Sequence, residues 1–290
     1  MKPPPFRYHA CSSLPQALDL LSSLDNAKVL AGGQSLMPML NMRFVFPDHL
    51  VDINPIADLA FIRDEPEAMR IGALTRQHAL ELSDALAQRH PILREALGHV
   101  GHIQTRNRGT IGGSLCHLDP AAELPAVVTA IGGEIEVAGT HGRRTIPMAE
   151  FPAFYMTPAI EPDEVVVAIR LPHWAAGHGY AFEEFARRHG DFAVVSASVL
   201  IELAASATVR RIAIVLGGIG TAPVQVVAAE QALIGTTPTP ETIAQAAALC
   251  RGVEARADPY ASAEYRQHLA GALAERALRR ALHRARPAGE

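Results

Sequence analysis

The segment Ala31-Gly-Gly-Gln-Ser35 follows a short apolar run, Lys28 to Ala31, that predicts a strand, and it precedes a predicted helix from Leu36 to Arg43. Glycine has no Cβ, so its backbone N–H group can approach an anion closely, and consecutive N–H groups in such a turn form a concave anion site. The positive end of the following helix would add to this attraction, and Gln34 and Ser35 offer side-chain donors. Taken alone, a glycine pair more often marks a plain tight turn, so both interpretations stay open at this point.

A second glycine pair lies in Arg106-Asn-Arg-Gly-Thr-Ile-Gly-Gly-Ser114, where Thr110 and Ser114 flank a predicted glycine turn. Asp119 follows, next to a predicted helix from Ala121 to Ile131. Its carboxylate can cap that helix, or it can accept hydrogen bonds from sugar hydroxyls. The loop by itself does not decide between these two roles.

The two glycine segments together fit a ligand that carries two phosphates. A dinucleotide is long and doubly charged, so two loops that are far apart in sequence can hold it from opposite sides. The sequence has neither Gly-x-Gly-x-x-Gly at its first strand–helix turn nor a P-loop with Gly-Lys-Ser/Thr. We therefore predict dinucleotide binding by a fold of another type.

The composition of the 290 residues excludes several other classes of protein. A net charge of −4 argues against a nucleic-acid-binding protein, which needs a basic face toward the phosphates. The apolar stretches end well before the about 20 residues of a membrane-spanning helix, and we expect no signal peptide. Cys11, Cys116 and Cys250 are scattered, which excludes a disulfide framework or an iron–sulfur cluster within this chain and favours reduced thiols in the cytoplasm.

Short strands mixed with helices, without regular βαβ alternation, predict an α+β protein. The expected elements include a helix from Leu14 to Leu24, which Ser12 or Ser13 can cap, and a hairpin formed by Glu134 to Ala138 and Arg143 to Ile146. The character of the chain changes near residue 173. Beyond it, strands are expected at 180–185, 194–203 and 209–216, followed by helices at 226–234, 240–250 and 261–286. We therefore expect two domains, residues 1–173 and residues 174–290.

Several motifs, in the same order along the chain, resemble a known family. They are Ala31-Gly-Gly-Gln-Ser-Leu36, Leu50-Val-Asp-Ile-Asn54, Ile71-Gly-Ala-Leu-Thr75, Arg106-Asn-Arg-Gly-Thr-Ile-Gly-Gly-Ser114, Asp119-Pro-Ala-Ala-Glu-Leu-Pro125, Arg187-Arg188 with Asp191, and Ala263-Glu-Tyr-Arg266. These motifs are similar to those of the FAD-binding medium subunits of molybdenum hydroxylases, the group of the carbon monoxide dehydrogenase medium chain and the FAD domain of xanthine dehydrogenase.

The resemblance implies the fold, the cofactor and the partners. It implies a vanillyl-alcohol-oxidase-type FAD-binding domain of two α/β subdomains, followed by a small domain with a three-stranded antiparallel sheet and helices. It also implies that FAD binds to this chain, while an iron–sulfur small subunit carries [2Fe–2S] clusters and a molybdopterin large subunit transforms the substrate. The assembly expected from the family is a dimer of heterotrimers, in which this chain passes electrons to an external acceptor.

The resemblance also assigns roles to residues. It places the FAD pyrophosphate between two segments: Val29, Leu30, Ala31, Gly32, Gly33, Gln34, Ser35 and Leu36 on one side, and Thr110, Ile111, Gly112, Gly113 and Ser114 on the other. It lets Asp119 meet a ribose or ribityl hydroxyl. Phe192 stands where relatives often have an aromatic residue near the flavin ring, although an aromatic residue on a strand is as often ordinary core.

The chain departs from its relatives at two positions. Cys116-His-Leu-Asp119 replaces the common Ala-His-Ala-Asp, and Glu184 stands where many relatives have a lysine. These differences leave the flavin potential and the substrate open, although the segments Met1 to Pro4 and Gln34 to Arg43 look slightly closer to those of N-heterocycle hydroxylases. Cys116 can be a small packing residue or a redox thiol, and packing is the commoner role of a free cysteine.

No catalytic residue and no metal ligand are expected in this chain, because its 13 histidines lack the spacing of a metal site. Two other classes of protein remain possible, a self-sufficient flavin oxidase of the same superfamily and a scaffold subunit without a cofactor. The basic stretch from Arg276 to Arg286 fits a helix end, where cations oppose the dipole, or a contact with an acidic partner subunit.

Overall fold

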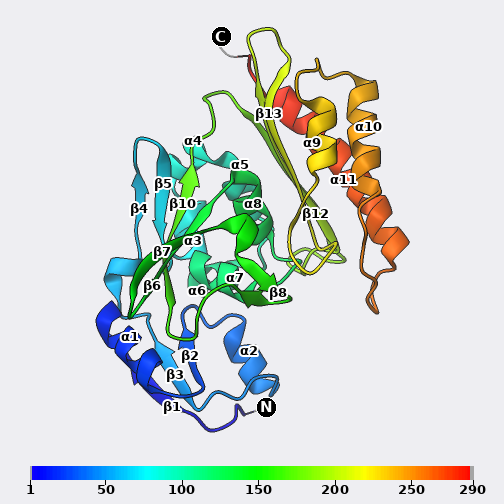
Figure 1. Ribbon diagram of the computed structural model, residues 1–290. Helices are drawn as coiled ribbons and strands as arrows, with labels where there is room; N and C mark the ends of the chain where they lie inside the picture. The colour runs from blue at the N-terminus through cyan, green and yellow to red at the C-terminus, as the bar shows by residue number, and fades with distance from the viewer. Residues whose placement is uncertain (1, 288–290) are drawn as a thin grey trace.

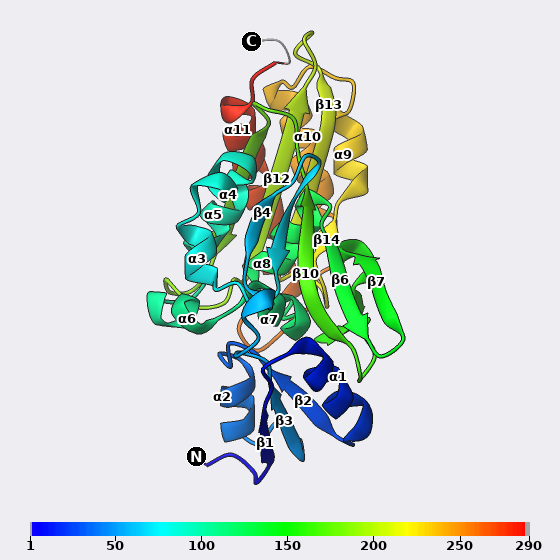
Figure 2. The ribbon, with the colours of Figure 1, turned by 90° about the vertical axis from the view of Figure 1, so that its left-hand side faces the viewer.

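The computed structural model describes residues 2–287, which form three sheet-containing parts in the order of the chain. Figure 1 shows the first part, in blue, at one end of the molecule and the last part, in yellow to red, at the other. Figure 2, turned by 90°, shows the second part between them. Within the described range, no helix is long and apolar enough to cross a membrane.

The first part is a parallel three-stranded sheet with two connecting helices. The strand order is β1 (Arg7–Ala10), β3 (His49–Asp52) and β2 (Ala27–Leu30), and the helices are α1 (Leu14–Ser23) and α2 (Leu36–Asn41). The side chain of Ser13 accepts a hydrogen bond from the N–H group of Gln16, which caps α1 as predicted. Ala17 and Leu21 of α1 are buried in one cluster with Val51 of β3, so the predicted helix covers the sheet.

The second part is an antiparallel five-stranded sheet with six helices. The strand order is β4 (Ile62–Asp64), β5 (Ala68–Gly72), β10 (Val165–Pro172), β6 (Glu134–Gly139) and β7 (Gly142–Pro147). The helices are α3 (Gln77–Glu81), α4 (Asp84–Arg89), α5 (Pro91–Leu97), α6 (Ile103–Arg108), α7 (Ile111–His117) and α8 (Glu123–Ile131). Short elements complete this part: the 3-10 helices at Ala57–Leu59 and Met148–Glu150 and the strand pair β8 (Pro152–Phe154) and β9 (Thr157–Pro158).

The third part is an antiparallel sheet of order β11 (Gly179–Phe185), β12 (Val195–Leu203), β13 (Val209–Gly217) and β14 (Val224–Gln225). Its helices are α9 (Val227–Leu233), α10 (Pro240–Arg251) and α11 (Ala263–Arg284). The side chains of β12 point alternately to the two faces of the sheet and pack into two different hydrophobic cores. Val199 belongs to the cluster of α9 to α11, whereas Leu200 belongs to the cluster of the second part. The sheet is thus buried on both faces, and it joins the second part to the three helices.

Most elements predicted from the sequence are present, including the hairpin, which is β6 paired with β7, and the three long strands and three helices of the third part. The sheet of that part has a short fourth strand, β14, beyond the three expected. Strands β1, β4, β8, β9 and β10 were not predicted. β10 is the central strand of its sheet and is buried on both faces, so most of it, Val165 to Ile169, is an apolar run without the alternation that marks a half-buried strand.

Thr75 precedes α3 but does not cap it. Its hydroxyl donates to the carbonyl of Phe61 and accepts from the N–H group of the same residue, and Arg76 occupies the N-cap position of α3. The hydroxyl therefore fixes the turn after β5 to the segment before β4. The local sequence shows only that a threonine precedes a helix. The residue that its hydroxyl actually bonds, Phe61, is 14 residues away in the chain.

Candidate dinucleotide site

The first glycine segment connects β2 to α2, and each of its two glycines is required for a different reason. A Cβ on Gly32 would lie 2.4 Å from the carbonyl oxygen of Arg108 and 2.8 Å from the Cα of Gly109, so any side chain would clash with that backbone. Gly33 has a φ of +72°, in the left-handed region that favours glycine. The segment is therefore a special turn that packs directly against the second glycine segment.

The same turn leaves a run of backbone donors free. Within residues 2–287, the N–H groups of Gly32, Gly33, Gln34 and Ser35 have no hydrogen-bond acceptor. The side chain of Gln34 is exposed and folds back, so that its Nε2 donates to the carbonyl of Gly32 at 3.2 Å. Free and consecutive N–H groups of this kind can form a concave anion site, and the anion site predicted here from the sequence stays a prediction.

The second glycine segment is not a turn, contrary to the prediction, but the first turn of α7. Thr110 is buried at its N-cap, where its Oγ1 accepts from the N–H group of Gly113 at 3.0 Å. The neighbouring N–H groups are also satisfied, because Ile111 donates to the carbonyl of Thr75, Gly112 to that of Ala73, and Ser114 to that of Thr110. The groups left for a ligand are the half-exposed surface of Gly113 and the hydroxyl of Ser114. A glycine pair looks the same in a turn and in a close helix contact, so sequence alone could not separate them.

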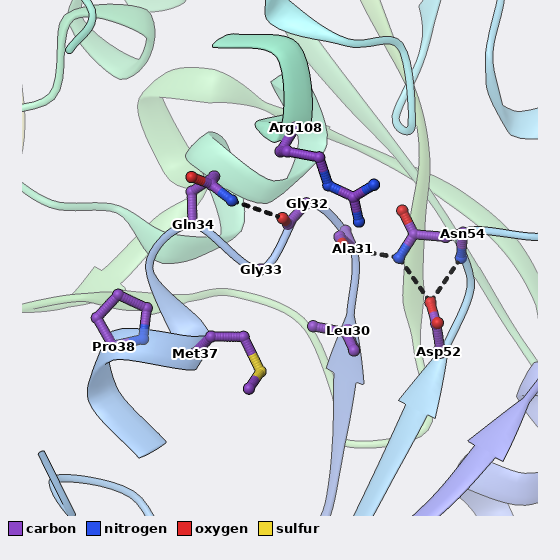
Figure 3. Close-up of a pocket in the computed structure, with 10 residues that line it drawn as sticks. All are labelled: Leu30, Ala31, Gly32, Gly33, Gln34, Met37, Pro38, Asp52, Asn54 and Arg108. Carbon is purple, nitrogen blue, oxygen red and sulfur yellow. Dashed lines mark hydrogen bonds between the residues drawn. The ribbon is translucent and has the colours of Figure 1, made fainter. Parts of the chain in front are cut away.

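The two segments meet beside an open pocket of 350 Å³, which Figure 3 shows. The pocket lies between the first segment, the end of β3 and the side chain of Arg108. Five of the predicted residues line it: Leu30, Ala31, Gly32, Gly33 and Gln34. Val29 lies behind it on β2, and Ser35 and Leu36 begin α2. The position of a Cβ on Gly113 would be 3.9 Å from that of Ala31, so α7 is also adjacent to the first segment.

Asp119 makes a local turn and is not the N-cap of α8. Its Oδ1 accepts from the N–H group of Ala121 at 2.9 Å, whereas α8 begins at Glu123 with Ala122 in the N-cap position. The possible role of Asp119 as a cap of this helix is therefore wrong. Its side chain does stabilise the turn that leads into the helix. The carboxylate is half-buried, and its proposed contact with a sugar hydroxyl stays a prediction.

Sequence reasoning missed the polar side chains that surround the pocket. Asn54 donates through Nδ2 to the carbonyl of Ala31 at 2.6 Å, and Asp52 Oδ1 accepts from both the N–H group and the Nδ2 of Asn54. Arg108 lines the pocket with an exposed side chain (Figure 3), and Arg76 lies close to it. Burial lowers the pKa of Arg76, and the charge of Arg108 lowers it further. The sequence signal for Asp52 and Asn54 is the motif Leu50 to Asn54, which resembles the family but by itself indicates no role for these residues.

Three other predicted positions are clarified by the structure. Burial raises the pKa of Cys116 to about 12, so its thiol stays protonated, as the packing interpretation requires. Phe192 is 58% exposed and is therefore not an ordinary core residue. The side chain of Glu184 on β11 is only 5% exposed and pairs with His99, whose Nδ1 lies 3.3 Å from its Oε1, and this pairing raises the pKa of His99.

This fold and this site define a dinucleotide-binding protein built from two α/β subdomains and an added antiparallel-sheet domain. The FAD binding domain in molybdopterin dehydrogenase, a known domain family, matches residues 4–174. The CO dehydrogenase flavoprotein C-terminal domain matches residues 180–281. The chain belongs to the family of FAD-binding medium subunits of molybdenum hydroxylases. The family predicted from the sequence motifs is thereby confirmed.

Whole-chain relatives agree with this family. The 6-hydroxypseudooxynicotine dehydrogenase complex subunit alpha of Paenarthrobacter nicotinovorans is 42% identical over 100% of this chain and 99% of its own. The carbon monoxide dehydrogenase medium chain of Afipia carboxidovorans is 38% identical over 99% of this chain and 100% of its own. A solved carbon monoxide dehydrogenase of Hydrogenophaga pseudoflava superposes with a TM-score of 0.96 and 39% identity, covering 99% of this chain and 100% of that one. The predicted cofactor, FAD on this chain, and the predicted fold class are both confirmed.

Proposed function

We propose that this chain is the electron outlet of a molybdenum hydroxylase, which receives electrons from the [2Fe–2S] clusters of a partner subunit and delivers them to an external acceptor. The observation that carries the binding of FAD is the row of free N–H groups from Gly32 to Ser35 at the pocket, and the electron-transfer role is supported by the family to which the chain belongs. When bound, FAD can accept electrons one at a time and release them as a pair. The protein's part is to hold the cofactor and to fix its orientation.

In the proposed arrangement, the first segment holds the FAD pyrophosphate with its backbone donors, and the Ser114 hydroxyl contributes from α7. Arg108 supplies a positive charge that the sequence prediction did not include. Asp119 accepts from a ribose or ribityl hydroxyl. The buried residues Thr110, Ile111 and Gly112 act indirectly, because their polar groups are used to fix α7 against β5 and the turn that follows it.

The partners that we propose are those of the family, an iron–sulfur small subunit and a molybdopterin large subunit in a dimer of heterotrimers. The relatives support this proposal, since they are named as a medium chain or as a subunit of a complex. We further propose a cytoplasmic location, which the three free cysteines support. The substrate is chosen by the large subunit, so its identity does not depend on the residues described above.

The test is a titration of the full chain, stripped of its flavin, with FAD. We expect one FAD per chain, a yellow flavin spectrum, and no oxidation of carbon monoxide, aldehydes or N-heterocycles until the partner subunits are added. Protein that stays colourless under excess FAD would overturn the proposal, and substrate turnover by the chain alone would favour the self-sufficient oxidase.

A matched pair of glycine variants locates the site within that titration. Gly33 has a φ of +72°, and Gly235 has a φ of +78° with no atom within 4 Å of its added Cβ. Gly33→Ala and Gly235→Ala therefore carry a similar backbone cost of about 1 kcal/mol. Only Gly33→Ala is expected to weaken FAD binding, by about tenfold or more, because it reshapes the donor turn. Equal FAD affinity in the two variants would contradict the assignment of the pyrophosphate.

A further inference from the structure

Arg76 lies where all the segments around the pocket meet. Its backbone forms an isolated antiparallel bridge with Thr110, and the N–H group of the next residue, Gln77, donates to the carbonyl of Gly109 at 2.9 Å. The main chain of Arg76 is thus fixed beside the second glycine segment. Its side chain is half-buried and extends toward the first part of the molecule, where it reaches the loop after β3.

The guanidinium of Arg76 donates to two acceptors, and each acceptor touches the first glycine segment. Nη1 donates to the carbonyl of Arg108 at 2.6 Å, and that carbonyl is the group against which Gly32 packs. Nη2 donates to Oδ1 of Asn54 at 2.7 Å, and Asn54 donates in turn to the carbonyl of Ala31. A single planar cation therefore links both sides of the pocket, and its two donor directions are fixed relative to each other.

Asn54 cannot turn its amide around without losing contacts. Asp52 Oδ1 accepts from Asn54 Nδ2 at 2.6 Å and from its N–H group at 2.9 Å, which directs Oδ1 of Asn54 toward Arg76. Tyr8 donates to the other oxygen of Asp52, so this carboxylate is also held in place. Figure 3 shows Asp52, Asn54 and Ala31 joined by these hydrogen bonds along one wall of the pocket.

The charges around Arg76 favour an anion in the pocket. Among residues 2–287, neither Arg76 nor Arg108 forms an ion pair with a carboxylate, although Asp52 lies one hydrogen-bonded residue away from Arg76. Burial lowers the pKa of Arg76, the charge of Arg108 lowers it further, and the nearby Asp52 carboxylate opposes this only in part, so the net effect destabilises the positive charge. A pyrophosphate would relieve this repulsion between the two cations.

We propose that Arg76 is a positioning residue that holds the two glycine segments at the spacing required by the pyrophosphate of FAD. This inference rests on the FAD site proposed above. Arg76 acts through Asn54 and the Arg108 carbonyl and need not contact the cofactor. Without it, the free N–H groups would remain, but they would no longer be held at a fixed distance from α7.

The experiment measures the dissociation constants of FAD and ADP for the flavin-free full chain carrying Arg76→Met. ADP contains the pyrophosphate but no flavin. We expect both constants to rise by the same factor, about tenfold or more, since two charge-assisted hydrogen bonds are lost. The same loss lowers the thermal midpoint of the flavin-free chain, so both dissociation constants are measured at a temperature where the variant is fully folded. Arg89→Met is the matched control, because Arg89 makes an exposed ion pair with Asp64 away from the pocket.

Two further variants separate positioning from a general structural role. Arg76→Lys keeps the charge but cannot span both acceptors, so it should weaken binding nearly as much as Arg76→Met, and it replaces that variant if Arg76→Met does not fold. Asn54→Ala interrupts the same link, so the loss in the double variant with Arg76→Met should be smaller than the product of the two single losses.

The outcomes distinguish this inference from the function on which it rests. Wild-type chain that binds no FAD contradicts the proposed function. Wild-type chain that binds FAD, together with Arg76→Met or Arg76→Lys that binds it within about twofold, overturns the role of Arg76 alone. Fully multiplicative losses with Asn54→Ala, or a loss for FAD without one for ADP, would also overturn it.

Discussion

Glu123 is the first residue of α8, and only 4% of its surface is exposed. No described residue forms an ion pair with it. Burial raises the pKa of Glu123 to about 8, and the nearby Glu184 contributes in the same direction. The carboxyl is therefore protonated in the folded chain at neutral pH, close to the Asp119 turn that borders the second segment.

This buried acid predicts a pH dependence of stability. The pKa of Glu123 is about 8 in the folded chain against 4.5 for an ordinary glutamate, so the folded state binds the extra proton between these values. The stability that this group contributes is complete below pH 4.5 and is lost as the pH rises toward and through about 8.

We expect Glu123→Gln, which keeps the shape and cannot ionise, to match the wild type at acid pH and to be more stable than it above pH 8. Thermal unfolding midpoints across pH measure the difference, with Glu254→Gln at an exposed position as the control. Parallel pH profiles for wild type and Glu123→Gln would show that the carboxyl is not buried as described.

For single residues, the sequence predicted the glycine turn of the first segment, because glycine and donor residues act within one turn; the role of this turn in FAD binding stays a prediction. The sequence did not predict Arg76 or Asn54, since their importance comes from partners on other elements. Arg76 meets Asn54 and Arg108, which are 22 and 32 residues away in the chain. Pairing over such distances leaves no local pattern in a single sequence.

The contact between α5, β11 and α11 also joins residues that are far apart in the chain, so no local sequence pattern predicts it. Arg280 of α11 pairs with both Glu95 of α5 and Glu183 of β11, and Arg284 pairs with Glu95 at 3.0 Å. Glu95 also accepts from the N–H group of Phe182 at 3.1 Å. The basic stretch at the end of the chain therefore has an intramolecular role, beyond the helix dipole or the acidic partner subunit that the sequence suggested.

Glu95 is predicted to connect the second part to the third. Glu95→Gln leaves Arg284 without a carboxylate, so we expect the free energy of unfolding to fall by about 1 to 3 kcal/mol. Glu275→Gln is the control, because the Glu275–Arg279 pair is exposed within one helix and should contribute less than about 0.5 kcal/mol. Urea unfolding measures both changes, and equal effects would contradict the role of Glu95.

For the whole molecule, we propose the domain division into residues 1–173 and 174–290 that the sequence predicts. No sheet spans the boundary, which supports the division within the described range. The cores are nevertheless shared, since Trp174, Phe182 and Leu200 belong to the cluster of the second part. Trp174 also donates from its indole N–H to the carbonyl of Ile131 at 3.1 Å.

This shared core predicts that the two proposed domains unfold together. Trp174 is the single tryptophan of the chain and lies at the boundary, so its fluorescence reports on the contact between domains. We expect its transition to coincide with that of the far-ultraviolet circular dichroism, and bound FAD to raise both midpoints equally. Two separate transitions would mean that the domains are independent despite the shared core.

The sequence by itself determined the α+β class, most helices and strands, the glycine turn after β2 and the family, because these depend on short-range patterns and on motifs in a fixed order. Tertiary structure alone decided the rest. It made the second glycine segment a helix start with satisfied N–H groups, placed β10 at the centre of its sheet, and directed Arg76 to both sides of the pocket. The reason is that a hydrogen-bond donor or an apolar run has many possible partners in the chain, and only the folded backbone brings one of them within reach.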